Sequence, residues 1–276
     1  MPEIAEVKLT SEFINSHKNV EFVKLEKSPV SKVKTDLSEM AFKKFIVRSN
    51  SRGKELTLDF IDSSVPFQEA TSKKMKVTLG MSGAWIYFDP KEPSNEKYLK
   101  HAHLRLTDTR GWILGMFDIR RFAKWSWNDF DKGRGPCPIS EELAFGDHLR
   151  DNWEKHRDFK KHKLSEILMS QRWFNGVGNY LRAEILYRLD RNPFMVASEL
   201  NIEDLNNLIA LTIGCAKTAY KLGGGQLKDW KNPTGEDPTS FREWMKCYGQ
   251  MDKITDGTGR TFWFNPKWKQ NETHGR

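Results

Sequence analysis

The chain has 276 residues, of which 38% are hydrophobic and 30% are charged. This composition is typical of a globular protein with a charged surface and excludes a disordered chain. No stretch of about 20 residues is apolar enough to cross a membrane, so an integral membrane protein is excluded. The start, Met-Pro-Glu-Ile-Ala-Glu, carries acidic residues and lacks the basic and apolar blocks of a secretory signal. We therefore expect an intracellular protein that is neither secreted nor membrane-bound.

The formal net charge of +8 favours a polyanionic partner, of which nucleic acid is the commonest. From charge alone, a basic soluble enzyme fits equally well. The cysteines Cys137, Cys215 and Cys247 are far apart and odd in number. They offer neither a disulfide framework nor a Cys-x-x-Cys pair, which indicates a reducing compartment.

The first half of the chain predicts a helix followed by strands. Apolar residues at near-helical spacing predict a helix over residues 3–17, with Pro2 where a first-turn proline is tolerated. Strict alternation then predicts strands at 55–60, 74–79, 103–106 and 112–116, with a turn at 108–111. A leading helix followed by short antiparallel strands predicts an α+β fold whose N-terminal domain, residues 1–130, is β-sandwich-like.

The second half predicts helices. Residues 131–150 begin with Asp-Lys-Gly-Arg-Gly-Pro-Cys-Pro and are interpreted as a linker. Helical spacing returns within residues 151–240, at 164–168, 183–187 and 205–209. The last helix stops at the glycines 223–225, and the composition of 223–240 predicts a mobile loop. In the terminal part, residues 241–276, a strand at 260–264 follows a turn at 256–259, which predicts a small hairpin.

One segment suggests a phosphate site. Phe174-Asn175-Gly176-Val177-Gly178-Asn179-Tyr180 joins two helical patterns, and its glycines allow a tight turn before a helix N-terminus. Free N–H groups at such a terminus suit a phosphate, and Asn179 could add a side-chain donor. An ordinary helix–helix turn explains the same residues.

Several motifs together resemble the formamidopyrimidine-DNA glycosylase / endonuclease VIII family, and the endonuclease VIII-like branch most closely. The run from Phe174 to Arg188 resembles its helix–two-turn–helix. The other motifs follow in the family's order over nearly the whole chain: Met1-Pro2-Glu3 with Glu6, Arg52-Gly53-Lys54-Glu55-Leu56, Gly80-Met81-Ser82-Gly83, His101-Ala102-His103-Leu104-Arg105 and Asp118-Ile119-Arg120-Arg121-Phe122. The resemblance implies that residues 151–240 are a helical helix–two-turn–helix domain.

The resemblance implies catalytic roles for Pro2, Glu3, Glu6 and Lys54. After removal of the initiator methionine, Pro2 would carry a free secondary amine, and an α-amine has a reference pKa near 8. Such an amine can attack the sugar C1′ and form a Schiff base. The family's acid/base residue corresponds to Glu3, whose pKa a closed pocket can raise, and Glu6 corresponds to a supporting group. Without the other motifs, a helix-starting proline and first-turn acids would explain these residues.

The resemblance also implies DNA-contacting residues. Lys54, His101, Asn179 and Arg260 correspond to phosphate-binding residues, and the planar fork of an arginine suits a phosphate. Met81, Arg120 and Phe122 correspond to residues that fill the void left by an everted base. Surface charges would explain the first group, and core packing would explain Met81 and Phe122.

The terminal region departs from relatives with zinc fingers. Cys247 stands alone, and one cysteine cannot make a tetrahedral zinc site. Residues 241–276 therefore resemble the zincless finger, a hairpin that must be held by packing, with Phe262, Trp263, Phe264 and Trp268 as candidates. We expect no metal and no cofactor.

The resulting hypothesis is a base-excision-repair DNA glycosylase with AP lyase activity. It would remove oxidised bases, mainly pyrimidines but also formamidopyrimidines and hydantoins, and nick the abasic site by β,δ-elimination. Its partner would be double-stranded DNA, with single-stranded DNA as a second candidate, bound by a monomer in the nucleus or another DNA-containing compartment. The alternatives are a non-catalytic nucleic-acid binder, which would not need Pro2, Glu3 and Lys54 in this order, and a weakly catalytic lesion binder that retains Met1.

Overall fold

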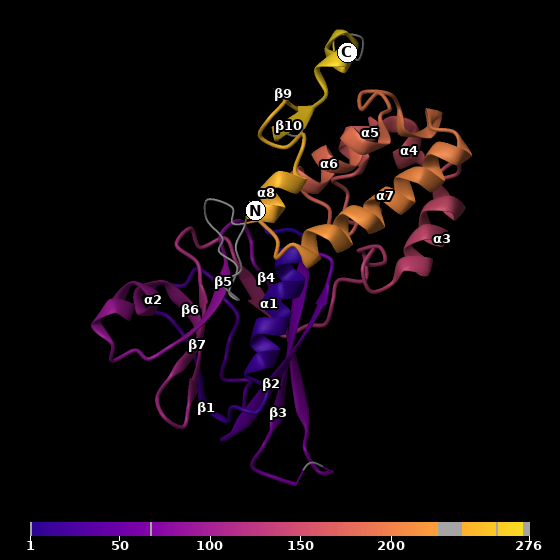
Figure 1. Ribbon diagram of the computed structural model, residues 1–276. Helices are drawn as coiled ribbons and strands as arrows, with labels where there is room; N and C mark the ends of the chain where they lie inside the picture. The colour runs from indigo at the N-terminus through magenta and orange to yellow at the C-terminus, as the bar shows by residue number, and fades with distance from the viewer. Residues whose placement is uncertain (1, 67, 226–238, 258, 273–276) are drawn as a thin grey trace. The chain divides into compact units, whose positions relative to one another are not determined.

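The computed structural model describes residues 2–66, 68–225, 239–257 and 259–272, and these form two compact units (Figure 1). The first unit contains Pro2, Glu6–Phe130 and Gly225, and the second contains Glu3–Ala5, Asp131–Gly224 and the described residues from 239 onward. The first unit is built on a sheet and the second mainly on helices, so the predicted α+β class is confirmed.

The chain begins with helix α1 (Ile4–Ser16), as the apolar spacing predicted. Val7 and Ile14 on this helix belong to the core of the first unit. Near its C-terminal end, the Asn15 amide exchanges two hydrogen bonds of 2.8 Å with the backbone of Ser49 in the sheet. These contacts fix the start of the chain against the sheet.

In the described part of the chain, eight strands form one antiparallel sheet in the order β5-β7-β6-β1-β2-β3-β4-β8. The strands are β1 (Phe22–Lys27), β2 (Phe45–Arg52), β3 (Glu55–Asp62), β4 (Ser72–Thr78), β5 (Ala84–Phe88), β6 (Ala102–Asp108), β7 (Ile113–Phe117) and β8 (Lys124–Ser126). Strands β1 and β2 share the single residue pair Phe22 and Phe45. The sheet therefore divides at this point into two halves.

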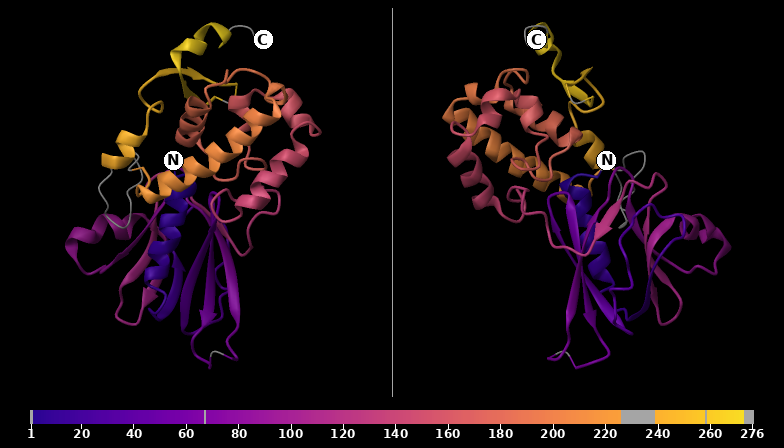
Figure 2. Two further views of the ribbon diagram at one scale, coloured as in Figure 1. Left: turned by 45° about the vertical axis from the view of Figure 1, so that its right-hand side comes forward. Right: turned by 180° about the vertical axis from the view of Figure 1, so that it is seen from behind.

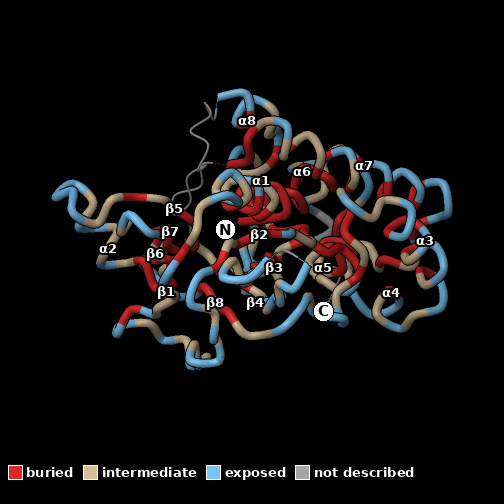
Figure 3. Tube along the Cα trace, turned by 90° about the horizontal axis from the view of Figure 1, so that it is seen from below, coloured by how far each residue is buried: buried red, intermediate tan, exposed pale blue. Residues whose placement is uncertain are grey.

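The two halves enclose one hydrophobic core. Buried side chains of both contribute to it, including Phe22, Phe45, Phe60, Trp85, Leu104 and Trp125. Figure 3 shows the buried positions along the strands, with exposed positions at their connections. Burial of apolar surface on facing inner sides is what holds a β-sandwich together. The predicted sandwich-like domain is thus present, with the short helix α2 (Glu96–His101) and the 3-10 turn η1 (Pro93–Asn95) before β6.

The second unit contains the remaining helices. They are α3 (Glu142–Asn152), α4 (Arg157–Lys161), α5 (Leu164–Ile167), α6 (Asn179–Leu189), α7 (Ile202–Lys221) and α8 (Thr239–Trp244), with the 3-10 turns η2 (Ala197–Glu199) and η3 (Pro266–Glu272). Helices α6 and α7 pack side by side, as both views in Figure 2 show. Among the described residues, none of the helices is long and apolar enough to span a bilayer.

The predicted linker 131–150 is wrong in its second part, because residues 142–150 belong to α3, where buried Phe145 and Leu149 supply an apolar face. The glycines and prolines at its start obscured this helix. Of the loop predicted at 223–240, residues 226–238 lie outside the described residues.

The predicted hairpin is present in the second unit, before η3. Strand β9 (Asp252–Thr255) pairs antiparallel with β10 (Thr261–Phe264). Phe262 and Phe264 are buried, and both rings pack edge-on against Phe194. The Trp263 ring lies 4.4 Å from that of Tyr248. The aromatic packing predicted for this hairpin is therefore present at Phe262, Trp263 and Phe264.

Candidate active site

The Glu3 carboxylate is held by the N-terminus of helix α6. It accepts hydrogen bonds from the backbone N–H groups of Gly178 (2.7 Å), Tyr180 (2.9 Å) and Leu181 (3.3 Å), and Glu3 is only 1% exposed. The positive end of the helix dipole and these donors stabilise a negative charge. The expectation that these three N–H groups are free for a phosphate is therefore wrong, because Glu3 occupies them.

Pro2 and Glu6 lie on either side of this anchored residue in the sequence. Pro2 is buried, and it joins directly to Glu3. Glu6 is 0% exposed, and its Oε1 accepts a hydrogen bond of 2.8 Å from the N–H of Gly225. Glu3 and Glu6 thus have different partners, and Glu6 fixes the backbone just before residue 226.

Lys54 lies in a tight turn of the sheet. Strands β2 and β3 are paired up to Arg52 and Glu55, so Gly53 and Lys54 form the connection between them. Lys54 is half-buried. A two-residue hairpin connection holds its backbone firmly, which suits a residue that must point to a fixed position.

The expected void-filling residues lie in two connections that the sheet brings together. Met81 lies between β4 and β5, and Arg120 and Phe122 lie between β7 and β8. At Gly80, with φ of +60°, a Cβ atom would lie 2.6 Å from the backbone carbon of Phe122. Only glycine allows so close an approach of the two connections.

Asp118 reinforces the same contact. It is 0% exposed and accepts hydrogen bonds from the Ser82 hydroxyl (2.5 Å), the Arg120 N–H (3.2 Å) and the Ala123 N–H (2.7 Å). One buried carboxylate therefore ties both connections together. Sequence reasoning assigned no role to Asp118, although an aspartate just before a turn is a signal for backbone capping.

The two connections present their tips to the surface. Phe122 is 48% exposed, and the Arg120 guanidinium lies 5.1 Å from the centre of its ring. Core packing therefore does not explain Phe122. Met81 is half-buried. The structure thus presents an aromatic ring and a stacked arginine together on an exposed turn.

His101 is the last residue of α2 and lines a surface pocket of the first unit. Lys100, Arg105 and Arg121 line the same pocket, together with the buried His103. Burial lowers the pKa of His103, whose Nε2 lies 3.0 Å from the Asp118 carbonyl oxygen. Sequence reasoning selected only His101 here. Lys100 and Arg105 are its near neighbours in sequence, whereas Arg121 comes from the connection between β7 and β8, which lies close only in the folded chain.

Asn179 and Arg260 both belong to the second unit. Asn179 is the first residue of α6, and its Oδ1 accepts a hydrogen bond of 3.1 Å from Arg182. Arg260 is exposed in the turn between β9 and β10. The Arg260 N–H donates to Asp256 Oδ1 at 3.0 Å. Sequence reasoning missed Arg182 and Asp256. The signal for Arg182 is a charged residue on the buried face of a helix, and the signal for Asp256 is an aspartate in a turn.

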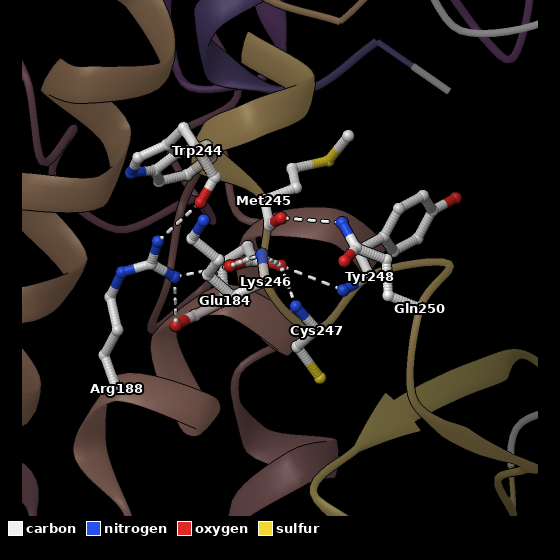
Figure 4. Close-up of polar contacts among 8 residues, drawn as sticks. All are labelled: Glu184, Arg188, Trp244, Met245, Lys246, Cys247, Tyr248 and Gln250. Atoms are coloured by element: carbon white, nitrogen blue, oxygen red, sulfur yellow. Dashed lines mark hydrogen bonds and ion pairs between the residues drawn. The ribbon is translucent and has the colours of Figure 1, made fainter. Parts of the chain in front are cut away.

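The base of the terminal hairpin is anchored by Glu184 of α6 (Figure 4). Its carboxylate accepts hydrogen bonds from the N–H groups of Lys246 (2.9 Å), Cys247 (2.8 Å) and Tyr248 (2.8 Å), and it pairs with Arg188. Burial, followed by the nearby Glu184 charge, raises the pKa of Cys247 to about 12. Across the described ranges, histidine, cysteine, aspartate and glutamate form no group of three or more that could hold a metal ion.

Comparisons with known proteins show what the chain is similar to. Residues 1–125 match the formamidopyrimidine-DNA glycosylase N-terminal domain, and residues 237–267 match the DNA-binding domain of endonuclease VIII-like 1. Human endonuclease 8-like 1 is 34% identical over 96% of this chain and 72% of its own length. The formamidopyrimidine-DNA glycosylase of Vibrio atlanticus is 28% identical over 91% of this chain and 89% of its own length.

Solved structures share the fold. MutM (Fpg) of Thermus thermophilus superposes with a TM-score of 0.74 at 22% identity, covering 97% of this chain and 98% of that one. Lactococcus lactis Fpg, in complex with DNA containing an oxidised pyrimidine, gives a TM-score of 0.75 at 21% identity, covering 97% and 99%. The relationship to endonuclease 8-like 1 and the formamidopyrimidine-DNA glycosylases identifies a DNA glycosylase of base excision repair. The chain belongs to the formamidopyrimidine-DNA glycosylase / endonuclease VIII family.

Proposed function

We propose that the chain is a bifunctional DNA glycosylase and AP lyase that acts through a Schiff base on Pro2. The observation that carries this proposal is the rigid placement of Glu3. Its carboxylate is fixed by three backbone donors of α6, directly after the residue whose amine would be the nucleophile. Hydrogen bonds of this kind fix a side chain in one orientation, as a catalytic carboxylate requires.

The reaction would begin at the sugar. The Pro2 nitrogen attacks C1′, the glycosidic bond breaks, and the damaged base leaves with a proton. The sugar ring opens as O4′ takes up a proton, and an iminium joins Pro2 to C1′. Loss of a C2′ proton then expels the 3′ phosphate, and a second elimination expels the 5′ phosphate. Glu3 would exchange protons with the opening sugar, and Glu6, in the first turn of α1, would support it.

DNA would be held by phosphate contacts and opened by the exposed turns. Lys54, His101, Asn179 and Arg260 are the proposed phosphate ligands. A base must leave the stack before its sugar can be attacked, and Met81, Arg120 and Phe122 would fill the space that it leaves. The exposed Phe122 ring with the Arg120 guanidinium stacked on it supports this role.

The proposed substrate rests on the resemblance to the endonuclease VIII-like branch. We propose oxidised pyrimidines as the main lesions, with formamidopyrimidines and hydantoins in addition, in double-stranded DNA and also in single-stranded DNA. The protein would act as a monomer inside the cell, in the nucleus or another DNA-containing compartment. It would need neither a metal nor a cofactor.

Borohydride trapping tests the mechanism. Protein with a free Pro2 is mixed with DNA that contains an abasic site or thymine glycol, and the reduced adduct is measured. We expect a covalent adduct and nicked DNA with the wild-type protein, and loss of both in Pro2→Gly or behind an N-terminal tag. Absence of adduct and of nicking in the wild-type protein, with DNA binding intact, would instead support the non-catalytic binder.

A further inference from the structure

Arg182 of helix α6 is a charged residue with 0% exposure. Its Nη1 donates to Asp256 Oδ2 at 2.6 Å and to the Ser165 carbonyl oxygen at 3.3 Å. Its Nη2 donates to Asn179 Oδ1 at 3.1 Å and to the Thr261 carbonyl oxygen at 3.2 Å. A buried ion pair stabilises a fold little better than apolar residues of the same volume. Stability alone is therefore a weak reason for this arginine.

The first branch of the contacts leads to Arg260. Asp256 binds Arg182 through Oδ2 and the Arg260 N–H through Oδ1. The Asp256 N–H in turn donates to the Arg260 carbonyl oxygen at 2.8 Å. A single carboxylate thus joins the guanidinium of Arg182 to the backbone of Arg260. The direction in which Arg260 leaves its turn depends on this carboxylate.

The second branch leads to Asn179. Asn179 Oδ1 accepts a hydrogen bond from the Arg182 guanidinium. A flip of the Asn179 amide would place its NH₂ group against the Arg182 N–H group, so that two donors would face each other. The NH₂ group of the amide is therefore directed away from Arg182. A phosphate accepts hydrogen bonds only, so this is the orientation that a phosphate ligand needs.

We propose that Arg182 is a positioning residue that holds Asn179 and Arg260 together in the arrangement in which both bind the DNA backbone. This inference rests on the proposed function, in which these two residues are phosphate ligands. Arg182 does not touch the DNA. It acts on one ligand through a direct hydrogen bond and on the other through Asp256.

The test measures whether the effects of Arg260→Ala and Asn179→Ala on DNA affinity depend on Arg182. Arg182→Lys keeps the charge, but a single ammonium cannot reproduce the fork that reaches both Asn179 and Asp256. Affinity for duplex DNA with a stable tetrahydrofuran abasic-site analogue is measured over a range of salt concentrations. We expect Arg260→Ala to weaken binding about tenfold in the wild-type background and to lower the salt slope by about one. In the Arg182→Lys background, it should weaken binding by less than about threefold. Asn179→Ala should show the same dependence.

Arg191→Lys is the matched control. Arg191 binds Asp204 at 2.8 Å in the same unit and its side chain is 49% exposed. In this background, Arg260→Ala should keep its full effect. If Arg182→Lys does not fold, Asp256→Asn replaces it, with the same loss of dependence expected for Arg260→Ala.

The outcomes separate the two proposals. A tenfold effect of Arg260→Ala in both backgrounds would overturn the positioning role of Arg182 and leave the proposed function intact. An Arg260→Ala protein that binds as the wild type does would instead remove Arg260 from the phosphate ligands.

Discussion

The carboxylate of Glu184 accepts a hydrogen bond of 2.8 Å from the backbone N–H of Cys247, the cysteine that has no Cys-x-x-Cys partner. The same carboxylate binds the N–H groups of Lys246 and Tyr248. An acidic side chain therefore fixes the backbone at the base of the hairpin. In a zinc finger, thiolates bound to metal fix the corresponding kind of turn.

Glu184→Gln should destabilise the second unit. The glutamine NH₂ would face either Cys247 and Tyr248, whose N–H groups donate to Oε1, or Arg188, which donates to Oε2. In both cases donors would be placed against donors. Leaving buried donors and a charged partner unsatisfied costs about 3 kcal/mol. Urea denaturation measures this loss. The control is Glu142→Gln, whose ion pair with Lys217 is on the surface and should contribute less than about 1 kcal/mol. Equal effects of both changes would contradict the anchoring role.

Removal of metal ions should leave the protein unchanged. The hairpin is held by Glu184 and by the Phe262 and Phe264 rings against Phe194, and none of these contacts involves a metal. We expect the same melting temperature and the same DNA affinity before and after treatment with 1,10-phenanthroline. Elemental analysis should find no stoichiometric zinc in the purified protein. One zinc ion per chain would contradict the zincless assignment.

The buried thiols should resist alkylation in the folded state. Burial raises the pKa of Cys215 to about 11, and burial with the Glu184 charge raises that of Cys247 to about 12. At pH 8 the Cys247 thiolate is therefore on the order of one part in 10,000, and the thiolate is the reactive form. Mass spectrometry after iodoacetamide treatment should find both cysteines unmodified in native protein and modified in urea. Rapid native alkylation would contradict their burial.

The raised pKa values of Cys215 and Cys247 should make the free energy of unfolding depend on pH. For both thiols the folded pKa lies above the ordinary value of 9.0. The folded state therefore binds more protons than the unfolded state above pH 9. The free energy of unfolding should fall as the pH rises from about 9 towards 12, and a Cys247→Ala variant should show a weaker fall in urea titrations.

Gly80→Ala should separate the two connections that carry Met81 and Phe122. The added Cβ would lie 2.6 Å from the Phe122 backbone, and φ of +60° is itself unfavourable for alanine. We expect a loss of about 3 kcal/mol in the free energy of unfolding and weaker binding to abasic-site DNA. Gly111→Ala is the matched control, because its φ is +91° but no atom lies within 4 Å of the added Cβ. It should show only the strain of the backbone, with unchanged DNA binding.

The sequence predicted the helices and strands whose apolar residues have a clear periodicity, and it missed elements such as β1 and β5 that lack one. Helix α1, strands β3, β4, β6 and β7, helices α6 and α7 and the terminal hairpin were all expected from their spacing. Strand β1 was not, because only Phe22 in it is buried. Strand β5, Ala-Trp-Ile-Tyr-Phe, is a short apolar run without alternation, which fits a helix or a strand.

For the candidate site, the sequence predicts residues that belong to a motif and misses residues outside the motifs. The motifs select Pro2, Glu3 and Arg260 as candidate site residues, but they do not indicate the contacts that fix these residues in the fold. Glu3 binds N–H groups about 175 positions further along the chain, and no local pattern encodes such a contact. Arg182 and Glu184 occupy the buried face of α6, where a charge signals a specific partner. Their partners, in turn, become evident only once the chain has folded.

Because the Glu184 anchor consists of a carboxylate and backbone N–H groups, it should be insensitive to oxidants. Peroxide and related oxidants attack thiolates and release the zinc that they hold. The Glu184 anchor offers them no such group. The backbone of residues 246–248 would therefore keep its geometry under the oxidative stress that produces oxidised bases, the proposed substrate.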